Sequence, residues 1–226
     1  MDLKNFLTEK CYIFQDKSPE ELEILLERTR PVIKELQKGE KISSQGDKAG
    51  YLGIVIRGSV AVKKSFSTGK VVTLATFGKG QAFGESVLFS ADPCYPADII
   101  AQEETKVFRL SREDLLFLLK SDREILLRFM ETISNRVLML SNKIELLSLG
   151  TIKQKIAYYL LRQAAREGKD RFTWEYSRNE LADYFNIPRP SLSRELARMK
   201  KEDLIGFNRR EVEIKKPEEL EEILLD

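Results

Sequence analysis

The stretch Ser177–Met199, SRNELADYFNIPRPSLSRELARM, decides the fold of the C-terminal third of the chain. It opens with a serine followed three residues later by a glutamate, a capping box that predicts the start of a helix. Asn186–Pro188 ends that helix, and a second helix follows at once from Arg189, with Pro190 tolerated in its first turn. Two short helices joined by a tight turn are the pattern of a helix-turn-helix.

The second helix of this stretch has two chemically different faces. At 100° per residue, Leu192, Leu196 and Met199 form one apolar stripe, and the opposite side carries arginine and serine. Small side chains let a helix approach the DNA major groove, where an arginine can make two hydrogen bonds to a guanine. The segment 204–214 is predicted to be a hairpin with two arginines at its tip, a wing able to contact phosphates. The candidate DNA-contacting residues are Arg189, Pro190, Ser191, Ser193, Arg194, Arg198, Arg209 and Arg210.

The charge distribution supports a DNA-binding interpretation of this region. The whole chain carries 38 Lys+Arg and 36 Asp+Glu, a net charge of +2. Residues 151–216 carry 16 basic and 10 acidic residues, a net charge of +6, whereas residues 217–226 contain five acids and no base. A local basic patch of this kind fits the negative charge of nucleic acid. The alternative is a merely solvated polar helix face in a small helical domain.

The residues that the chain lacks restrict its chemistry. It has no histidine and only two cysteines, Cys11 and Cys94. Histidine-based catalytic triads and histidine-ligated haem are therefore excluded, as is a four-cysteine iron–sulfur cluster within one chain. We expect no enzyme activity and no metal site. Redox sensing by either thiol is one hypothesis, and an inert, partly buried thiol is the other.

The same composition indicates where the protein acts. Two cysteines do not make a secreted disulfide scaffold, so a reducing cytoplasm is expected. No apolar run is long enough to span a membrane, and residues 1–5 lack the plan of a signal peptide.

The N-terminal half has the pattern of a small antiparallel β-structure. Nine of the twelve glycines fall between Gly39 and Gly84, and short segments rich in β-branched residues separate them. Such strands with turn glycines between them predict a barrel or a sandwich. The expected strands cover residues 52–56, 60–62, 71–74, 97–101 and 105–110, and a short helix is expected after Ser18.

A long helix is expected from residue 122 to residue 149. Ser121–Glu124 matches a full capping box, and Gly150 ends the segment. The apolar residues are spaced alternately four and three apart over three heptads, which favours a parallel dimeric coiled coil over a core-facing amphipathic helix. The candidate dimer-interface residues are Leu126, Met130, Ile133, Val137, Leu140, Ile144 and Leu147.

Several motifs occur in a fixed order along the chain: Lys38–Glu40, Gly46–Asp47, Ile56–Val60, Gly80–Glu85, the long helix, Ser177–Ala182 and Ser193–Leu196. Through them the chain resembles the catabolite activator/fumarate-nitrate regulator (CRP/FNR) family of bacterial transcription factors over nearly its whole length. The resemblance implies an α+β fold in three parts: a cyclic-nucleotide-binding-like double-stranded β-helix or jelly roll, a dimerisation helix and a winged helix-turn-helix. The corresponding ranges are 1–121 for the effector-sensing domain, 122–149 for the helix and 150–226 for the DNA-binding domain.

The family resemblance also implies function and partners. The chain is expected to be a homodimer that binds double-stranded DNA at a pseudo-palindromic operator and acts with RNA polymerase. Its DNA affinity would be controlled by a small-molecule effector in the β-roll. The alternatives are a sensor module whose winged helix contacts other proteins, and a regulator controlled by thiol oxidation.

Two departures from the family pattern concern specificity. Arg194 matches the family's guanine-contacting arginine, but Pro190 stands where many members have a glutamate that accepts a hydrogen bond from a base. Cyclic-nucleotide-binding members also carry Arg-Ser/Thr-Ala about ten residues after the Gly-Glu pair, where this chain has Tyr95-Pro96-Ala97. Burying a phosphodiester without that arginine would cost roughly 2–5 kcal/mol, so cyclic AMP is disfavoured. The candidate effector-pocket residues are Gly84, Glu85, Ser86, Tyr95, Ala97, Leu140 and Ser141, the last two in place of the family's Thr-Ser pair.

Overall fold

The computed structural model describes residues 2–225 of the chain, so the predicted domain limits at residues 1 and 226 lie outside the described residues. It contains two compact units, the first ending at Arg136 and the second beginning at Val137. This division falls inside one continuous helix, α5 (Arg123–Ser148). The predicted ranges 1–121, 122–149 and 150–226 stay a prediction.

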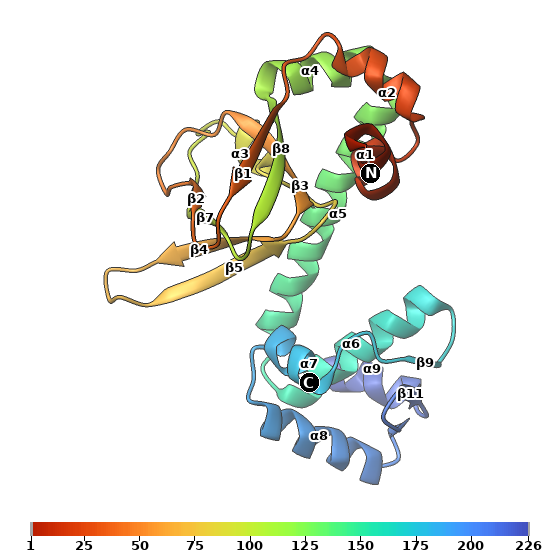
Figure 1. Ribbon diagram of the computed structural model, residues 1–226. Helices are drawn as coiled ribbons and strands as arrows, with labels where there is room; N and C mark the ends of the chain where they lie inside the picture. Colours follow the sequence, from red (N-terminus) through yellow and green to blue (C-terminus); the bar gives the residue numbers. More distant parts are fainter. Residues whose placement is uncertain (1, 226) are drawn as a thin grey trace. The chain divides into compact units, whose positions relative to one another are not determined.

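The N-terminal unit contains two four-stranded antiparallel sheets, which together form the predicted β-roll (Figure 1). The first sheet has the order β1-β8-β3-β6 and the second β2-β7-β4-β5. The strands are β1 (Val32–Leu36), β2 (Lys41–Ser43), β3 (Tyr51–Arg57), β4 (Val60–Ser65), β5 (Val71–Phe77), β6 (Ala82–Phe83), β7 (Asp98–Ala101) and β8 (Thr105–Ser111). The five strands expected from the sequence are present, four of them extended by one to three residues at an end and β7 shortened by one. The sequence patterns do not predict strands β1, β2 and β6.

Apolar residues on alternate positions of the strands give the β-roll two separate cores. One core lies between the sheets and includes Val55, Phe83, Tyr95 and Val107. The other lies on the outer face of the first sheet, where strand residues such as Phe108 pack with residues of the helices. The first sheet is thus covered on both faces, as its long apolar strand β3 requires.

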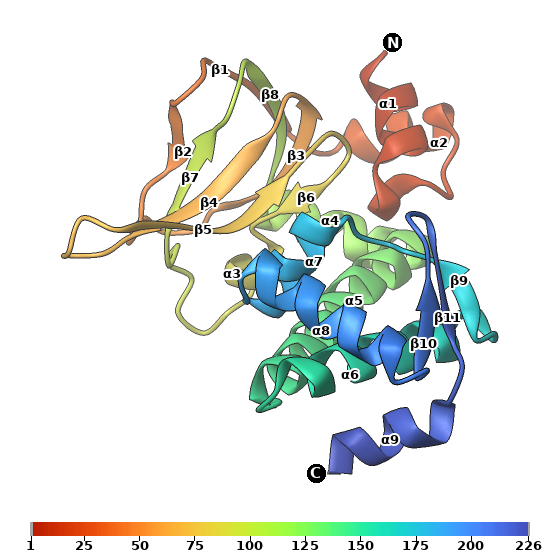
Figure 2. The same ribbon diagram turned by 90° about the horizontal axis from the view of Figure 1, so that it is seen from below.

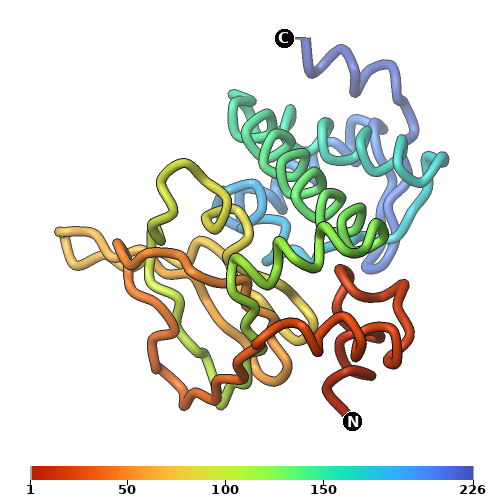
Figure 3. The backbone as a smooth tube through the Cα atoms, turned by 90° about the horizontal axis from the view of Figure 1, so that it is seen from above, coloured from red at the N-terminus to blue at the C-terminus, as the bar shows by residue number. Residues whose placement is uncertain are grey.

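Five helical segments belong wholly to this unit, and Figure 3 traces the backbone through them. They are α1 (Leu3–Lys10), the 3₁₀ segment η1 (Tyr12–Phe14), α2 (Pro19–Leu26), α3 (Glu85–Leu88) and α4 (Arg112–Ser121). Helix α2 begins with the predicted capping box, in which Ser18 and Glu21 bond each other's backbone N–H groups. Helix α1 is not among the predicted elements, although Asp2 caps its start by accepting a hydrogen bond of 2.8 Å from the backbone N–H of Leu3.

The start of α5 corrects one local prediction. Ser121 does not cap the helix but is the last residue of α4. Asp122 takes the capping role, since its Oδ1 accepts hydrogen bonds of 3.0 Å from the backbone N–H groups of Glu124 and Ile125. Lys17 holds this carboxylate through an ion pair of 2.8 Å. The predicted capping box at Ser121 is therefore wrong, and an aspartate cap replaces it.

The C-terminal unit is a small helical domain with a three-stranded sheet (Figure 2). Its elements are α6 (Ile152–Glu167), β9 (Arg171–Thr173), α7 (Arg178–Phe185), α8 (Arg189–Lys201), β10 (Ile205–Phe207), β11 (Glu211–Ile214) and α9 (Pro217–Leu225). The sheet order is β10-β11-β9, and β10 and β11 form the predicted hairpin. The acidic tail, for which the sequence patterns predict no element, forms α9, whose Leu220 is buried in the core of the unit.

Candidate functional site

Helices α7 and α8 form the predicted helix-turn-helix. Ser177 and Glu180 make a capping box at the start of α7. The turn between the helices depends on Asn186, which ends α7 in the left-handed conformation with φ 54°, a conformation that asparagine tolerates better than most residues. Pro190 lies in the first turn of α8, where it removes no intrahelical hydrogen bond.

The two faces of α8 are separated as the sequence predicts. Leu192, Leu196 and Met199 are buried in the core of the C-terminal unit. The outward face carries the candidate DNA contacts, of which Arg189, Pro190, Ser193, Arg194 and Arg198 are exposed and Ser191 is half-buried. The packing of the apolar stripe therefore fixes which side chains a DNA groove would meet.

The arginines on this face differ in how far their charge is already compensated. Arg198 donates from Nε to Glu202 over 2.9 Å, and Glu202 also pairs with Lys153. Arg194 makes no ion pair within residues 2–225, and its Nη2 donates a hydrogen bond to Ser191 Oγ at 3.3 Å. Arg189 is likewise free of ion pairs in the described part of the chain. Arg189 and Arg194 are thus the available cations, whereas the charge of Arg198 is already compensated.

The hairpin places two further arginines at its tip. Asn208 Oδ1 accepts hydrogen bonds of 2.8 Å from the backbone N–H groups of Arg210 and Glu211, which fixes the turn. The side chains of Arg209 and Arg210 are exposed beyond it. This is the geometry of a wing that can reach phosphates.

Arg178 is a residue of this region that the sequence analysis does not single out. Its guanidinium lies 3.9 Å from the ring centroid of Trp174 and 5.0 Å from that of Phe207. Because Arg178 is the first residue of α7 and Phe207 lies in β10, this contact links the start of the helix-turn-helix to a strand of the wing. Burial lowers its pKa, and its Nη1 is buried without a hydrogen-bond partner in the described chain. Trp174 lies only four residues before Arg178, so a local pattern could reveal that contact, whereas Phe207 is distant along the chain.

The predicted dimer face of α5 is an exposed apolar stripe. Ile144 is 69% exposed and Val137 59%, values unusual for large aliphatic side chains of a folded chain. Met130, Leu140 and Leu147 are also exposed, Leu126 is marginally so, and Ile133 is half-buried. An uncovered stripe with a heptad spacing is the surface that a second helix would bury.

A buried ion pair marks the candidate effector site in the N-terminal unit. Glu85 follows Gly84 at the start of α3 and is 1% exposed. It pairs with Arg136 of α5, whose Nη2 also donates to the carbonyl of Ala82 over 2.6 Å. Beyond this ion pair, the two oxygens of Glu85 have no hydrogen-bond partner among the described residues. Unused acceptors on a buried carboxylate are available to a ligand's donors.

Tyr95 lies beside Gly84, the residue before Glu85, in the core between the two sheets. It is 3% exposed, its hydroxyl has no hydrogen-bond partner within the described chain, and burial raises its pKa. A Cβ at Gly84 would lie 3.5 Å from the Tyr95 hydroxyl, so the two predicted residues are neighbours. Tyr95 therefore places a neutral phenol beside Gly84 and Glu85.

Polar groups that the sequence analysis does not identify accompany Tyr95. The Tyr51 hydroxyl lies 2.8 Å from Ser43 Oγ, and the guanidinium of Arg109 lies 3.4 Å from the Tyr51 ring centroid. The rings of Tyr51 and Tyr95 are 6.4 Å apart. Arg109 and Arg136 come from β8 and α5, far from the Gly-Glu motif in sequence, so no local pattern points to them.

The other predicted effector residues are placed differently. Ala97 is buried, but Ser86 is exposed, so it does not share the buried environment of Glu85. Leu140 and Ser141 are exposed residues of α5 that belong to the C-terminal unit, whereas the Glu85 cluster lies in the N-terminal unit. The cluster that the structure does bring together consists of Gly84, Glu85, Tyr95 and Arg136.

The two thiols have environments that disfavour the thiolate. Cys11 is 1% exposed, and burial raises its pKa to about 11. Cys94 is exposed, and a hydrogen bond to Asp92 raises its pKa. Because the thiolate is the reactive form, neither environment favours a redox sensor. Residues 2–225 contain no cluster of three or more cysteine or acidic side chains that could hold a metal ion.

The fold and these sites define a class of protein: a β-roll sensor domain joined to a DNA-binding helix-turn-helix. Comparison with known families agrees in both halves. Residues 33–122 match the cyclic nucleotide-binding domain, and residues 154–223 match the Crp-like helix-turn-helix domain. The chain belongs to the CRP/FNR family of transcription regulators. None of the helices described is both long and apolar enough to cross a bilayer.

Known relatives extend over nearly the whole chain. The cyclic AMP receptor protein of Thermus thermophilus is 28% identical over 211 residues, which cover 93% of this chain and 95% of the relative. The crystal structure of the Thermus thermophilus catabolite activator protein has a TM-score of 0.54 at 27% identity and covers 95% of this chain and 98% of its own. CprK complexed with OCPA has a TM-score of 0.64 at 16% identity, covers 90% and 93%, and shows the shared fold.

Proposed function

We propose that this chain is a homodimeric, sequence-specific transcription regulator of the cytoplasm, whose affinity for double-stranded DNA is set by an effector in the β-roll. The observation that carries the proposal is the outward face of α8. Arg194 is exposed on this face and makes no ion pair among the described residues, whereas the apolar stripe on the opposite face of the helix is fully buried. An arginine in this state can contact a guanine edge in the major groove with two hydrogen bonds.

The dimer proposal rests on the apolar stripe of α5. Two copies of this helix would bury Val137, Leu140 and Ile144 against their equivalents, at about 1.5–3 kcal/mol for each fully buried side chain. The two α8 helices of such a dimer would enter successive major grooves about 34 Å apart, so the operator should be pseudo-palindromic. As in the family, such a regulator would act on RNA polymerase at the promoters it occupies.

The experiment that tests this function is selection of bound sequences from random duplex DNA, followed by footprinting. A palindromic consensus with half-sites one helical turn apart, bound by the dimer, is the expected result. Ile144→Lys should yield monomers in sedimentation and abolish palindrome binding, whereas the exposed Lys70→Gln in the β4–β5 turn should leave both unchanged. Selection without a consensus, with weak binding that does not respond to salt, would favour a protein-binding role for the winged helix instead.

We further propose that the effector is not cyclic AMP, although one relative is named a cyclic AMP receptor protein. Tyr95 is buried and neutral, so the position that would neutralise a phosphodiester carries no charge. Arg136 does not replace it, since it is already paired with the buried Glu85, and Arg109 is held against the ring of Tyr51. A ligand suited to this interior would instead hydrogen-bond to the carboxylate of Glu85 and the phenol of Tyr95.

Control by the effector would be a population shift. A ligand can move the equilibrium between DNA-binding and non-binding conformers only by as much as its affinity differs between them. The Glu85–Arg136 pair supplies a route for such a difference, because it joins the effector cluster directly to α5, the helix that continues into the DNA-binding unit. A ligand that binds Glu85 or Arg136 in place of the other would change how strongly the β-roll is attached to α5.

A further inference from the structure

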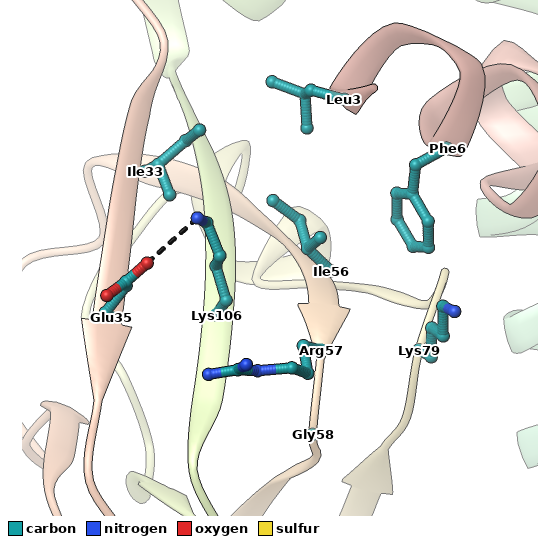
Figure 4. A pocket seen from close by; sticks show the side chains of 9 residues that line it. All are labelled: Leu3, Phe6, Ile33, Glu35, Ile56, Arg57, Gly58, Lys79 and Lys106. Carbon is teal, nitrogen blue, oxygen red and sulfur yellow. Dashed lines mark ion pairs between the residues drawn. The ribbon is translucent and has the colours of Figure 1, made fainter. Parts of the chain in front are cut away.

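The outer face of the first β-sheet carries a groove that the proposed function does not use. The groove has a volume of about 570 Å³ and is lined from α1, β1, β3, β8 and two loops (Figure 4). It lies on the opposite side of the sheet from the core that contains Tyr95. Its lining residues are Leu3, Phe6, Ile33, Glu35, Ile56, Arg57, Gly58, Lys79 and Lys106.

One part of the groove is apolar. Leu3 and Phe6 extend from α1 toward Ile33 of β1 and Ile56 of β3, as Figure 4 shows. Ile33 is 43% exposed, although the strand residue opposite it, Phe108, is fully buried. The apolar outer core of the unit is therefore left open at this point rather than closed by α1.

The other part of the groove is cationic. Lys106 Nζ pairs with Glu35 Oε1 across the strands at 2.9 Å, and Arg57 pairs with Glu104. Lys79 makes no ion pair within residues 2–225, and its Nζ lies 5.4 Å from the ring centroid of Phe6. With two of the three cations compensated, the groove keeps about one unit of uncompensated positive charge, next to the apolar wall.

The position of Lys79 is fixed by the backbone next to it. Gly80 has φ +84°, and a Cβ there would come within 2.3 Å of the carbonyl oxygen of Lys10 at the end of α1. Only glycine allows this close approach. Packing of the loop against α1 therefore fixes the backbone beside Lys79 at the mouth of the groove, where the exposed Lys79 side chain is accessible to a ligand.

From this geometry we infer that the groove binds a small organic monoanion with an apolar body, such as a medium-chain or aromatic carboxylate. The apolar body would lie between Phe6, Ile33 and Ile56, and its carboxylate would pair with Lys79. The volume is within the range of small-molecule sites, and a single anionic group matches the single uncompensated cation. This site is separate from the effector cluster around Glu85 and does not depend on the proposed DNA-binding function.

The test is a titration of the full-length protein, labelled at its isoleucine δ-methyl groups, with sodium octanoate followed by NMR. We expect saturable shifts of the Ile33 and Ile56 signals and none at Ile144, which belongs to the C-terminal unit. Octylammonium should bind at least tenfold more weakly, because it has the same apolar body and the opposite charge. Sulfate alone should cause no saturable shift, because it lacks the apolar body.

Matched variants assign the charge contact. Lys79→Gln should weaken octanoate binding about tenfold, which is about 1.4 kcal/mol, and Lys70→Gln should leave it unchanged. The inference is overturned if Lys79→Gln binds octanoate as tightly as the unmodified chain, or if octylammonium binds equally well. Shifts that spread to Ile144, or that sulfate reproduces, would also overturn it, since they indicate a nonspecific apolar or anion effect.

Discussion

The recognition helix and the interior of the β-roll are two binding regions built in opposite ways. Helix α8 presents its candidate ligand-contacting side chains on the surface, and every one of them lies within a few residues of the next along the chain. In the interior cluster Glu85 of α3 and Tyr95 of the loop before β7 are buried, and Arg136 of α5 is half-buried. The DNA specificity of α8 can therefore change through a surface substitution, whereas a substitution in the interior cluster also affects the stability of the fold.

The largest effect is expected at the buried ion pair. Arg136→Ala leaves the Glu85 carboxylate buried without its partner, which should cost about 3 kcal/mol of unfolding free energy. Urea denaturation of the full chain measures this value. The double variant Glu85→Gln/Arg136→Ala should recover most of the loss, because no buried charge then remains. If Arg136→Ala loses less than about 0.5 kcal/mol of unfolding free energy, the interior cluster does not contribute more to stability than the exposed side chains of α8 do.

An intermediate effect is expected on α8, where stability should not change. Arg194→Ala should weaken binding to the selected operator by about 1–3 kcal/mol and leave nonspecific DNA binding nearly intact. Fluorescence anisotropy with operator and scrambled duplexes measures both affinities. Arg28→Ala, an exposed arginine of the N-terminal unit, is the matched control. Equal losses on both duplexes would mean that Arg194 contacts phosphate rather than a base.

The wing should contribute affinity without specificity. Replacing both Arg209 and Arg210 with alanine should make the dependence of log affinity on log salt less steep, by about one unit of slope for each phosphate that the wing no longer reaches. The measurement is a salt titration on the operator and on scrambled DNA, and the change in slope should be the same on both. A change confined to the operator would place these side chains at bases.

The smallest effect is expected at Asp122, which lies in neither binding region. Burial alone would raise the pKa of this carboxyl, but hydrogen bonds from Lys17 and from the start of α5 outweigh it, so the pKa is lowered. A lowered pKa gives stability that is present above the unfolded value of about 3.9 and is lost as the pH falls through the folded value. Asp122→Asn keeps a capping side chain and loses the charge, so it should cost about 0.5 kcal/mol at pH 7 and nothing at pH 2. Urea denaturation at the two pH values checks this, and an equal cost at both would contradict the ionic origin.

The comparison also explains what the sequence can predict. The helix-turn-helix, its capping box and the apolar stripe at Leu192, Leu196 and Met199 follow from periodicity and turn residues, and the structure confirms them. Glycine placement predicts most of the β-roll strands but not β1 and β2, because their residues alternate weakly and pair with strands distant in sequence, nor the two-residue strand β6. Local sequence signals determine helices and strands more reliably than they determine which strands pair with each other.

The effector cluster shows the same limit more strongly. Gly84 and Glu85 form a local motif that the sequence reveals, whereas Arg136 lies about fifty residues away and meets Glu85 only because α5 packs against the β-roll. Leu140 and Ser141 are assigned by resemblance alone, and they belong to the other unit of the structure. At the start of α5 the sequence analysis predicts Ser121 as the cap, but Asp122 takes this role and also pairs with Lys17, a contact that no local pattern contains.

The most direct test of the central claim is the affinity for the selected operator measured with and without cyclic AMP. The claim is that the DNA-contacting surface is of the family type while the effector cluster is not suited to a cyclic phosphodiester. We predict the same dissociation constant in both conditions, with Arg194→Ala weakening it in both. Tenfold or tighter binding in the presence of cyclic AMP would contradict the account, because the nucleotide would then be accommodated despite the neutral, buried Tyr95.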